Sequence, residues 1–137
     1  MKVLEVEWRI LKDDDPGWQL MRVLYAYFVA RPVELLYVGK AWGTTVSSRV
    51  TANDKGAFWR DFERTYGNRE PRVMLGDVIL EPGTRFTREL LADIESLIIR
   101  REQPWGNIQS TRTRISRPGM RVICSGAWKW KREYRDR

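Results

Sequence analysis

The fold is decided by two short apolar runs, residues 23–29 (VLYAYFV) and residues 35–38 (LLYV). Aromatic and β-branched residues favour strands, and the segment between the runs contains Pro32, which is typical of a loop. The two runs therefore predict an antiparallel hairpin. Because side chains alternate along a strand, Tyr25 and Tyr27 are expected on one face of the sheet.

Further strands are expected on both sides of this hairpin. Residues 3–11 alternate apolar and polar side chains, and residues 72–80 carry apolar side chains at strand spacing. Gly39, directly after the second run, is expected to let the chain turn out of the sheet.

Three helices are expected after the hairpin. Residues 45–53 predict a short helix capped by Thr44 or Thr45, and residues 58–64 predict a second. The clearest helix begins after Thr84 or Thr87, carries apolar residues at helical spacing, and is ended by Pro104.

Composition limits the classes of protein to consider. The 137 residues suffice for one core, so we expect one domain, 1–137. The net charge of +7 favours a polyanionic partner such as nucleic acid. Histidine is absent, which excludes histidine-ligated zinc and Ser-His-Asp triads. The lone Cys124 and the lack of any bilayer-length apolar run favour a cytoplasmic protein without membrane contact.

Several residues recur in the order and spacing of a known active site. Val23-Leu24-Tyr25 precedes Tyr37-Val38-Gly39-Lys40 by eleven residues, and Arg49, Glu95 and Asn107 follow. Together these motifs resemble those of the GIY-YIG nucleases, over about residues 21–108. Val23 departs from the glycine that is usual in that family, and Tyr27 is an alternative to Tyr25 as the first-motif tyrosine.

The resemblance implies an α+β (α/β sandwich-like) fold, with a small central antiparallel β-sheet flanked by helices. Residues 1–20 would then form an N-terminal strand and turn, and residues 109–137 a basic C-terminal extension. The implied activity is that of a metal-dependent endonuclease that leaves 5′-phosphate and 3′-hydroxyl ends. The alternative is a catalytically inactive module that binds nucleic acid with the same fold.

The chemistry of phosphodiester hydrolysis gives these residue types roles. Glu95 is the candidate ligand for one Mg²⁺ or Mn²⁺ ion, because Mg²⁺ typically takes one or two protein carboxylates. Arg49 is the candidate phosphate clamp. Tyr25 is a general base or a positioner of water, and Tyr37 a ligand of water and phosphate. A phenol has an ordinary pKa near 10, so Tyr25 acts as a base only if cations such as Lys40 lower that pKa.

Asn107 is expected to support the site by tying the chain after the last helix back against it. The partner implied is DNA, with RNA a weaker alternative. A homodimer would be a route to cutting both strands, although no heptad pattern points to it.

The C-terminal part is rich in basic residues that could follow a phosphate backbone, while an indole of Trp128 or Trp130 stacks on a base. The alternative is a solvated basic surface with core tryptophans. The candidate nucleic-acid-binding residues are Arg112, Arg114, Arg117, Arg121, Lys129 and Lys131.

Overall fold

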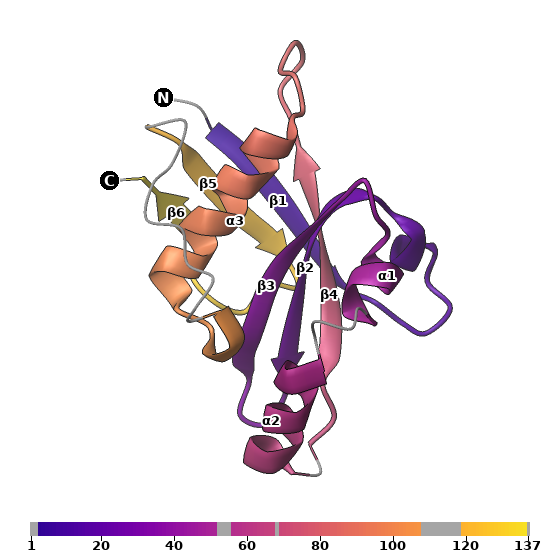
Figure 1. Ribbon diagram of the computed structural model, residues 1–137. Coiled ribbons are helices and arrows are strands. Elements are labelled where there is room, and N and C mark those ends of the chain that lie inside the picture. The colour runs from indigo at the N-terminus through magenta and orange to yellow at the C-terminus, as the bar shows by residue number, and fades with distance from the viewer. Residues whose placement is uncertain (1–2, 52–55, 68, 108–118, 137) are drawn as a thin grey trace.

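The computed structural model describes residues 3–51, 56–67, 69–107 and 119–136, and its centre is a six-stranded mixed sheet (Figure 1). The strand order is β3-β2-β4-β1-β5-β6, in which β1 and β5 are parallel and all other neighbours antiparallel. The strands are β1 (Val3–Ile10), β2 (Arg22–Val29), β3 (Glu34–Trp42), β4 (Arg72–Ile79), β5 (Arg121–Gly126) and β6 (Glu133–Arg135).

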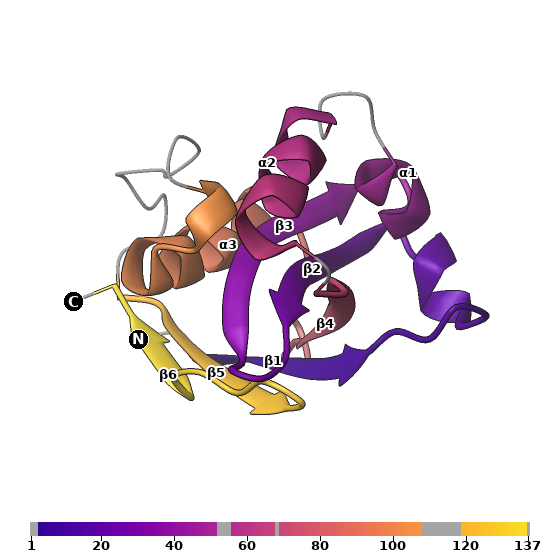
Figure 2. The same cartoon turned by 90° about the horizontal axis from the view of Figure 1, so that it is seen from below.

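Within the described residues, three α-helices accompany the sheet: α1 (Val46–Val50), α2 (Gly56–Tyr66) and α3 (Arg88–Glu102). Two short 3-10 helices, η1 (Pro16–Gln19) and η3 (Trp105–Asn107), complete the described elements. The sheet curls around α3, as Figure 2 shows. All six strands contribute buried side chains to the core that α3 fills.

The expected fold class is wrong. The described part of the chain is dominated by a curled, half-barrel-like mixed sheet of six strands with three short helices, not by a small antiparallel sheet flanked by helices. The difference arises because β1 lies between β4 and β5, so that both ends of the chain enter the sheet. Pairing of β1 with β5 joins segments more than a hundred residues apart, which local sequence patterns do not report.

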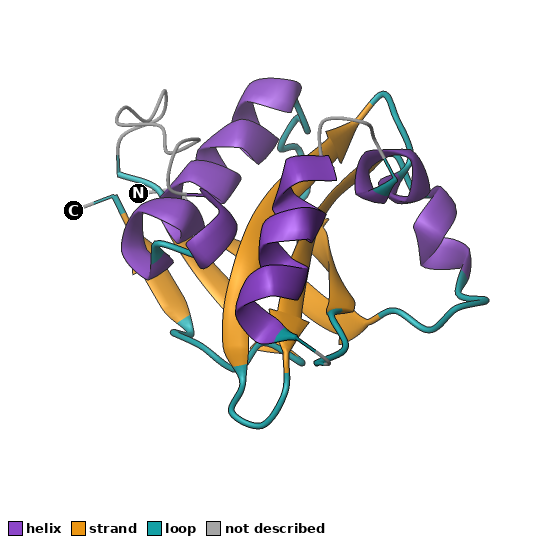
Figure 3. Ribbon diagram, turned by 60° about the horizontal axis from the view of Figure 1, so that its bottom comes forward, coloured by secondary structure: helices purple, strands orange, loops and turns teal. Residues whose placement is uncertain are grey.

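The predicted hairpin is confirmed as β2 and β3, and β2 is buried on both faces. Leu24, Ala26 and Phe28 point into the core around α3, whereas Tyr25 and Tyr27 point into a second core on the opposite face. This second core is largely aromatic and is completed by α2, which lies across the hairpin (Figure 3). Two buried faces explain why β2 is a continuous apolar run.

Hydrogen bonds identify the cap residues of α1 and α3, for each of which the sequence offered two threonines. Thr45 caps α1, because its hydroxyl accepts from the Ser48 N–H at 3.0 Å. Thr87 caps α3, because its hydroxyl accepts from the Leu90 N–H at 3.1 Å. Both caps satisfy backbone donors that the first turn of a helix leaves unpaired.

Candidate functional site

Gly39 marks the centre of the candidate site. It lies within β3, directly opposite Tyr25 on β2, and β3 continues beyond it to Trp42, so the predicted turn at Gly39 is wrong. A Cβ at this position would lie 2.6 Å from the Tyr25 hydroxyl and 2.8 Å from Cε2 of Tyr37. A glycine is therefore required here so that the ring of Tyr25 can approach the backbone of β3, since this ring occupies the space that a side chain would fill.

The two phenols meet over this glycine. The ring centroids of Tyr25 and Tyr37 are 6.1 Å apart. Tyr27 lies opposite Tyr37 on the paired strand and stacks on its ring, with centroids 5.2 Å apart, and it also contacts Trp59 at 5.0 Å. Tyr25 differs from Tyr27 in lying directly opposite Gly39 and in being acted on by the charge of Arg49.

Arg49 reaches the phenols from α1. The short helix is held by the Thr45 cap and by the Val46 N–H, which donates to the Leu20 carbonyl at 3.1 Å. Val46 is buried against the aromatic core, so the helix has one orientation on the sheet. The charge of Arg49 acts on the Tyr25 hydroxyl, which shows that the two groups are near neighbours.

Glu95 enters from α3 and forms an ion pair with Lys40 on β3, with Nζ and Oε1 3.4 Å apart. Both side chains are partly exposed, at 29% for Lys40 and 14% for Glu95. Glu95 also acts electrostatically on Tyr25. The carboxylate of α3 and the phenol of β2 therefore approach the same edge of the sheet.

The Tyr25 hydroxyl is buried, and this burial raises its pKa above the ordinary value of 10.0, while the charge of Arg49 opposes the rise. Arg49 and Tyr37 lie close enough to influence the hydroxyl, but no described residue makes a hydrogen bond of normal geometry to it. The phenol is thus held neutral at physiological pH, which disfavours a phenolate base.

Asn107 clamps the edge strand. Its side-chain oxygen accepts from the Val38 N–H at 2.7 Å, and its amide nitrogen donates to the Val38 carbonyl at 2.9 Å. The side chain is buried and replaces the missing neighbour strand of β3. Gly106 permits this approach, because a Cβ there would lie 2.8 Å from the Leu36 carbonyl oxygen.

An open pocket of about 230 Å³ lies beside these groups. Three residues that line the pocket were not predicted from the sequence as site residues, namely Trp42, Thr44 and Arg88. A signal for Arg88 was present, because it precedes Glu95 by seven residues and so shares its helix face. The pocket is strongly cationic, and its lining residues are Lys40, Trp42, Thr44, Arg49 and Arg88.

Among the described residues, no group of three acidic or cysteine side chains converges as a metal site. One carboxylate, that of Glu95, lies at the sheet edge near the phenols. A single carboxylate fits Mg²⁺, which usually keeps several of its waters. The same carboxylate is shared with Lys40.

The structure describes three of the six candidate nucleic-acid-binding residues of the C-terminal part. Arg112, Arg114 and Arg117 lie outside the described residues. Arg121 forms an ion pair with Glu133 at 2.7 Å, and this bond is the main reason that the pKa of Glu133 falls to about 2. The exposed Lys129 and Lys131 remain at the surface.

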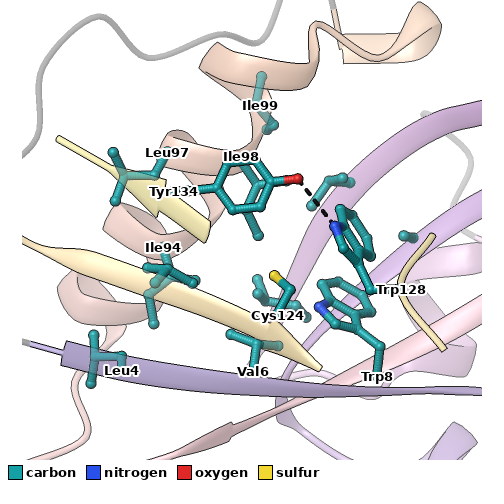
Figure 4. Close-up of a cluster of buried hydrophobic side chains, with 14 of the residues drawn as sticks. Leu4, Val6, Trp8, Ile94, Leu97, Ile98, Ile99, Cys124, Trp128 and Tyr134 are labelled. Carbon is teal, nitrogen blue, oxygen red and sulfur yellow. Dashed lines mark hydrogen bonds between the residues drawn. The ribbon is translucent and has the colours of Figure 1, made fainter. Parts of the chain in front are cut away.

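Trp128 is a core residue. Its indole is fully buried and stacks on Trp8, with ring centroids 4.5 Å apart (Figure 4). Trp130 is only partly buried and packs edge-on against Trp128. Base stacking by Trp128 is therefore excluded in this fold.

Comparison with known protein families, with curated proteins and with solved structures finds no match. Among the described residues, no helix has the length and apolar character needed to cross a membrane.

Proposed function

We propose that this protein is a metal-dependent endonuclease that hydrolyses DNA phosphodiester bonds at the edge of β3. The supporting observation is that Tyr25, Tyr37, Lys40, Arg49 and Glu95 converge around Gly39. These residues come from β2, β3, α1 and α3, and up to seventy residues separate them. They are also the residues that the motif resemblance selects.

The cationic pocket is the binding place for the scissile phosphate. Lys40, Arg49 and Arg88 line it, and a guanidinium can hold two phosphate oxygens at once. Their positive charges stabilise the extra negative charge that develops on the phosphoryl oxygens during displacement. A divalent cation bound through Glu95, Mg²⁺ or Mn²⁺, would supply Lewis-acid stabilisation of the same charge.

The phenols act as neutral groups. Burial raises the pKa of Tyr25, so this phenol stays protonated and does not act as the base. Tyr37, which is only half-buried, orients the attacking water. The water oxygen bonds to phosphorus as the bond to the 3′-oxygen breaks, and its proton passes to bulk water. The 3′-oxygen takes a proton from solvent, leaving 5′-phosphate and 3′-hydroxyl ends.

The test is nicking of supercoiled plasmid by the wild-type protein and by Glu95→Gln, with Mg²⁺ or Mn²⁺ present. The variant should bind DNA like wild type and cut at least about 100-fold more slowly, the scale of one charge-stabilising group. Glu63→Gln is the matched control, because Glu63 is exposed on α2, and it should cut at the wild-type rate. Absence of nicking by wild type, or equal rates for Glu95→Gln, would refute the proposal.

A second candidate is a module that binds nucleic acid without cutting it. The observation in its favour is the ion pair between Lys40 and Glu95, which neutralises the carboxylate that a metal would need. DNA binding by wild type with no cleavage of DNA or RNA would select this candidate. In either case we place the protein in the cytoplasm, because Cys124 is a buried free thiol.

A further inference from the structure

A second hollow adjoins the cationic pocket. It has a volume of about 400 Å³ and shares the lining residues Trp42 and Arg88 with the pocket, so the two hollows are neighbours. We call this hollow the Trp42 groove. Its lining residues are Arg22, Trp42, Arg85, Phe86, Thr87, Arg88 and Glu89.

The Trp42 groove contains an aromatic platform. Trp42 and Phe86 are half-buried and pack edge to face, with ring centroids 5.4 Å apart. The guanidinium of Arg22 lies over the Trp42 ring, 5.0 Å from its centroid. Aromatic rings combined with a planar guanidinium are the chemistry on which an unpaired base stacks.

The groove also carries three arginines beside this platform. Arg22, Arg85 and Arg88 are exposed, and none of them forms an ion pair with another described residue. Arg88 opens α3, where the helix macrodipole disfavours a positive charge. The position of Arg88 therefore does not stabilise the helix, which is consistent with a role toward an anionic ligand.

We propose that the Trp42 groove binds single-stranded DNA next to the phosphate held in the cationic pocket. One base stacks against Trp42 and Phe86, and neighbouring phosphates contact Arg22, Arg85 and Arg88. Base faces are buried in a duplex, so the substrate is DNA with an unpaired segment, such as a flap, a fork or a gap. This inference rests on the proposed function, because the adjoining pocket holds the phosphate to be cut.

The test measures binding apart from cleavage. In the Glu95→Gln background, fluorescence anisotropy gives the affinity for a single-stranded oligonucleotide, a blunt duplex and a duplex with a single-stranded flap. The flap and the single strand should bind at least about 10-fold more tightly than the duplex, since only they offer unpaired bases that can stack. A duplex that binds as tightly as the flap would overturn the inference, and tighter binding of the matching RNA would overturn the assignment to DNA.

Variants of the groove residues test whether the Trp42 groove causes the preference for single-stranded DNA. Replacing Arg22, Arg85 and Arg88 together by alanine should reduce the slope of log affinity against log salt by about 2, as three phosphate contacts to a single strand require. The control is Arg101→Ala, at the other end of α3 and about 20 Å away, which should keep the wild-type slope. Equal slopes for the triple variant and the control would overturn the inference.

Phe86→Leu tests the stacking. It keeps the apolar volume of the groove and removes one ring, so a few-fold loss of single-strand affinity is expected with no change in the salt slope. Wild-type affinity would refute the stacking.

The inference and the proposed function can fail separately. If wild type never cuts but the triple variant loses single-strand affinity, the nuclease proposal falls and the groove stands. If wild type nicks plasmid and the triple variant binds normally, the groove inference falls and the nuclease proposal stands.

Discussion

At each end of the curled sheet, a buried tyrosine lies near a glutamate of α3. The two ends differ in how these polar groups are hydrogen-bonded. At the β6 end, the Tyr134 hydroxyl donates to Glu102 at 2.7 Å and accepts from the Trp128 indole N–H at 3.1 Å (Figure 4). At the β3 end, the Tyr25 hydroxyl is buried without a hydrogen bond of normal geometry, and Glu95 shares a partly exposed ion pair.

The difference agrees with a structural role for the β6 end and with the proposed role of the β3 end. Buried polar groups are costly unless they are hydrogen-bonded, so the β6 end is built for stability. The β3 end retains a buried phenol and a cluster of charges next to an open pocket, which costs stability and provides binding capacity. Four predictions test this contrast.

The largest expected effect is on stability at the β6 end. Trp128→Ala should lower the free energy of unfolding by about 3–5 kcal/mol, because it removes a fully buried indole stacked on Trp8. Trp42→Ala, which removes a half-buried indole at the β3 end, should cost clearly less. Urea denaturation measures both, and equal losses would break the contrast.

Gly39→Ala should lower the free energy of unfolding by about 1–3 kcal/mol through overpacking, because the new Cβ would lie 2.6 Å from the Tyr25 ring. The displaced phenols should also reduce plasmid nicking. Gly56→Ala is the control, since a Cβ there meets only the Arg60 side chain, at 3.6 Å. A Gly39→Ala protein with wild-type stability would show that the positions of the two phenols do not depend on the absence of a side chain at residue 39.

Removing each hydroxyl compares the two tyrosines directly. Tyr134→Phe should cost about 1–2 kcal/mol of unfolding free energy, because Glu102 loses its buried hydrogen-bond donor. Tyr25→Phe should change stability by less than about 0.5 kcal/mol, because its hydroxyl has no such bond to lose. Thermal and urea unfolding of both variants show which substitution lowers stability more. A larger loss for Tyr25→Phe than for Tyr134→Phe would contradict the structural role of the β6 end.

The smallest effect concerns pH. Burial raises the pKa of the Cys124 thiol, beneath Trp8, from 9.0 to about 12. A raised pKa stabilises the fold fully below about pH 9, and this contribution is lost as the pH rises toward 12. Between about pH 9 and 10, unfolding free energy should fall by about 1 kcal/mol more in wild type than in Cys124→Ala. Parallel curves for the two proteins would show that the thiol does not contribute.

Local patterns predicted the hairpin and the helices well, and the order of the sheet poorly. The runs that became β2 and β3 are apolar over their whole length, and Thr45 and Thr87 are strong cap residues, so their signals are local. The neighbours of β1 are not local, because β4 and β5 are distant in the chain. The motif resemblance implied a small antiparallel sheet, and no local pattern indicated that β1 would pair in parallel with β5.

The candidate site shows the same division. The motif resemblance selected Tyr25, Tyr37, Lys40, Arg49 and Glu95, all of which lie near Gly39 in the fold. Basic content selected the C-terminal residues, one of which, Arg121, forms an ion pair with Glu133. The groove arginines were not predicted, because Arg22 and Arg85 are distant in the sequence and line the same hollow only in the folded chain.

The amino-acid sequence by itself determined the hairpin, the strands near residues 3–11 and 72–80, the three helices and which side chains carry charge, because backbone preference and apolar periodicity act over a few residues. Tertiary structure alone decided that both chain ends join one curled sheet, that the Tyr25 phenol is buried and neutral, and that Trp42 and Arg88 connect a cationic pocket to a groove. These properties depend on burial and on contacts between distant segments, and neither exists until the chain has folded.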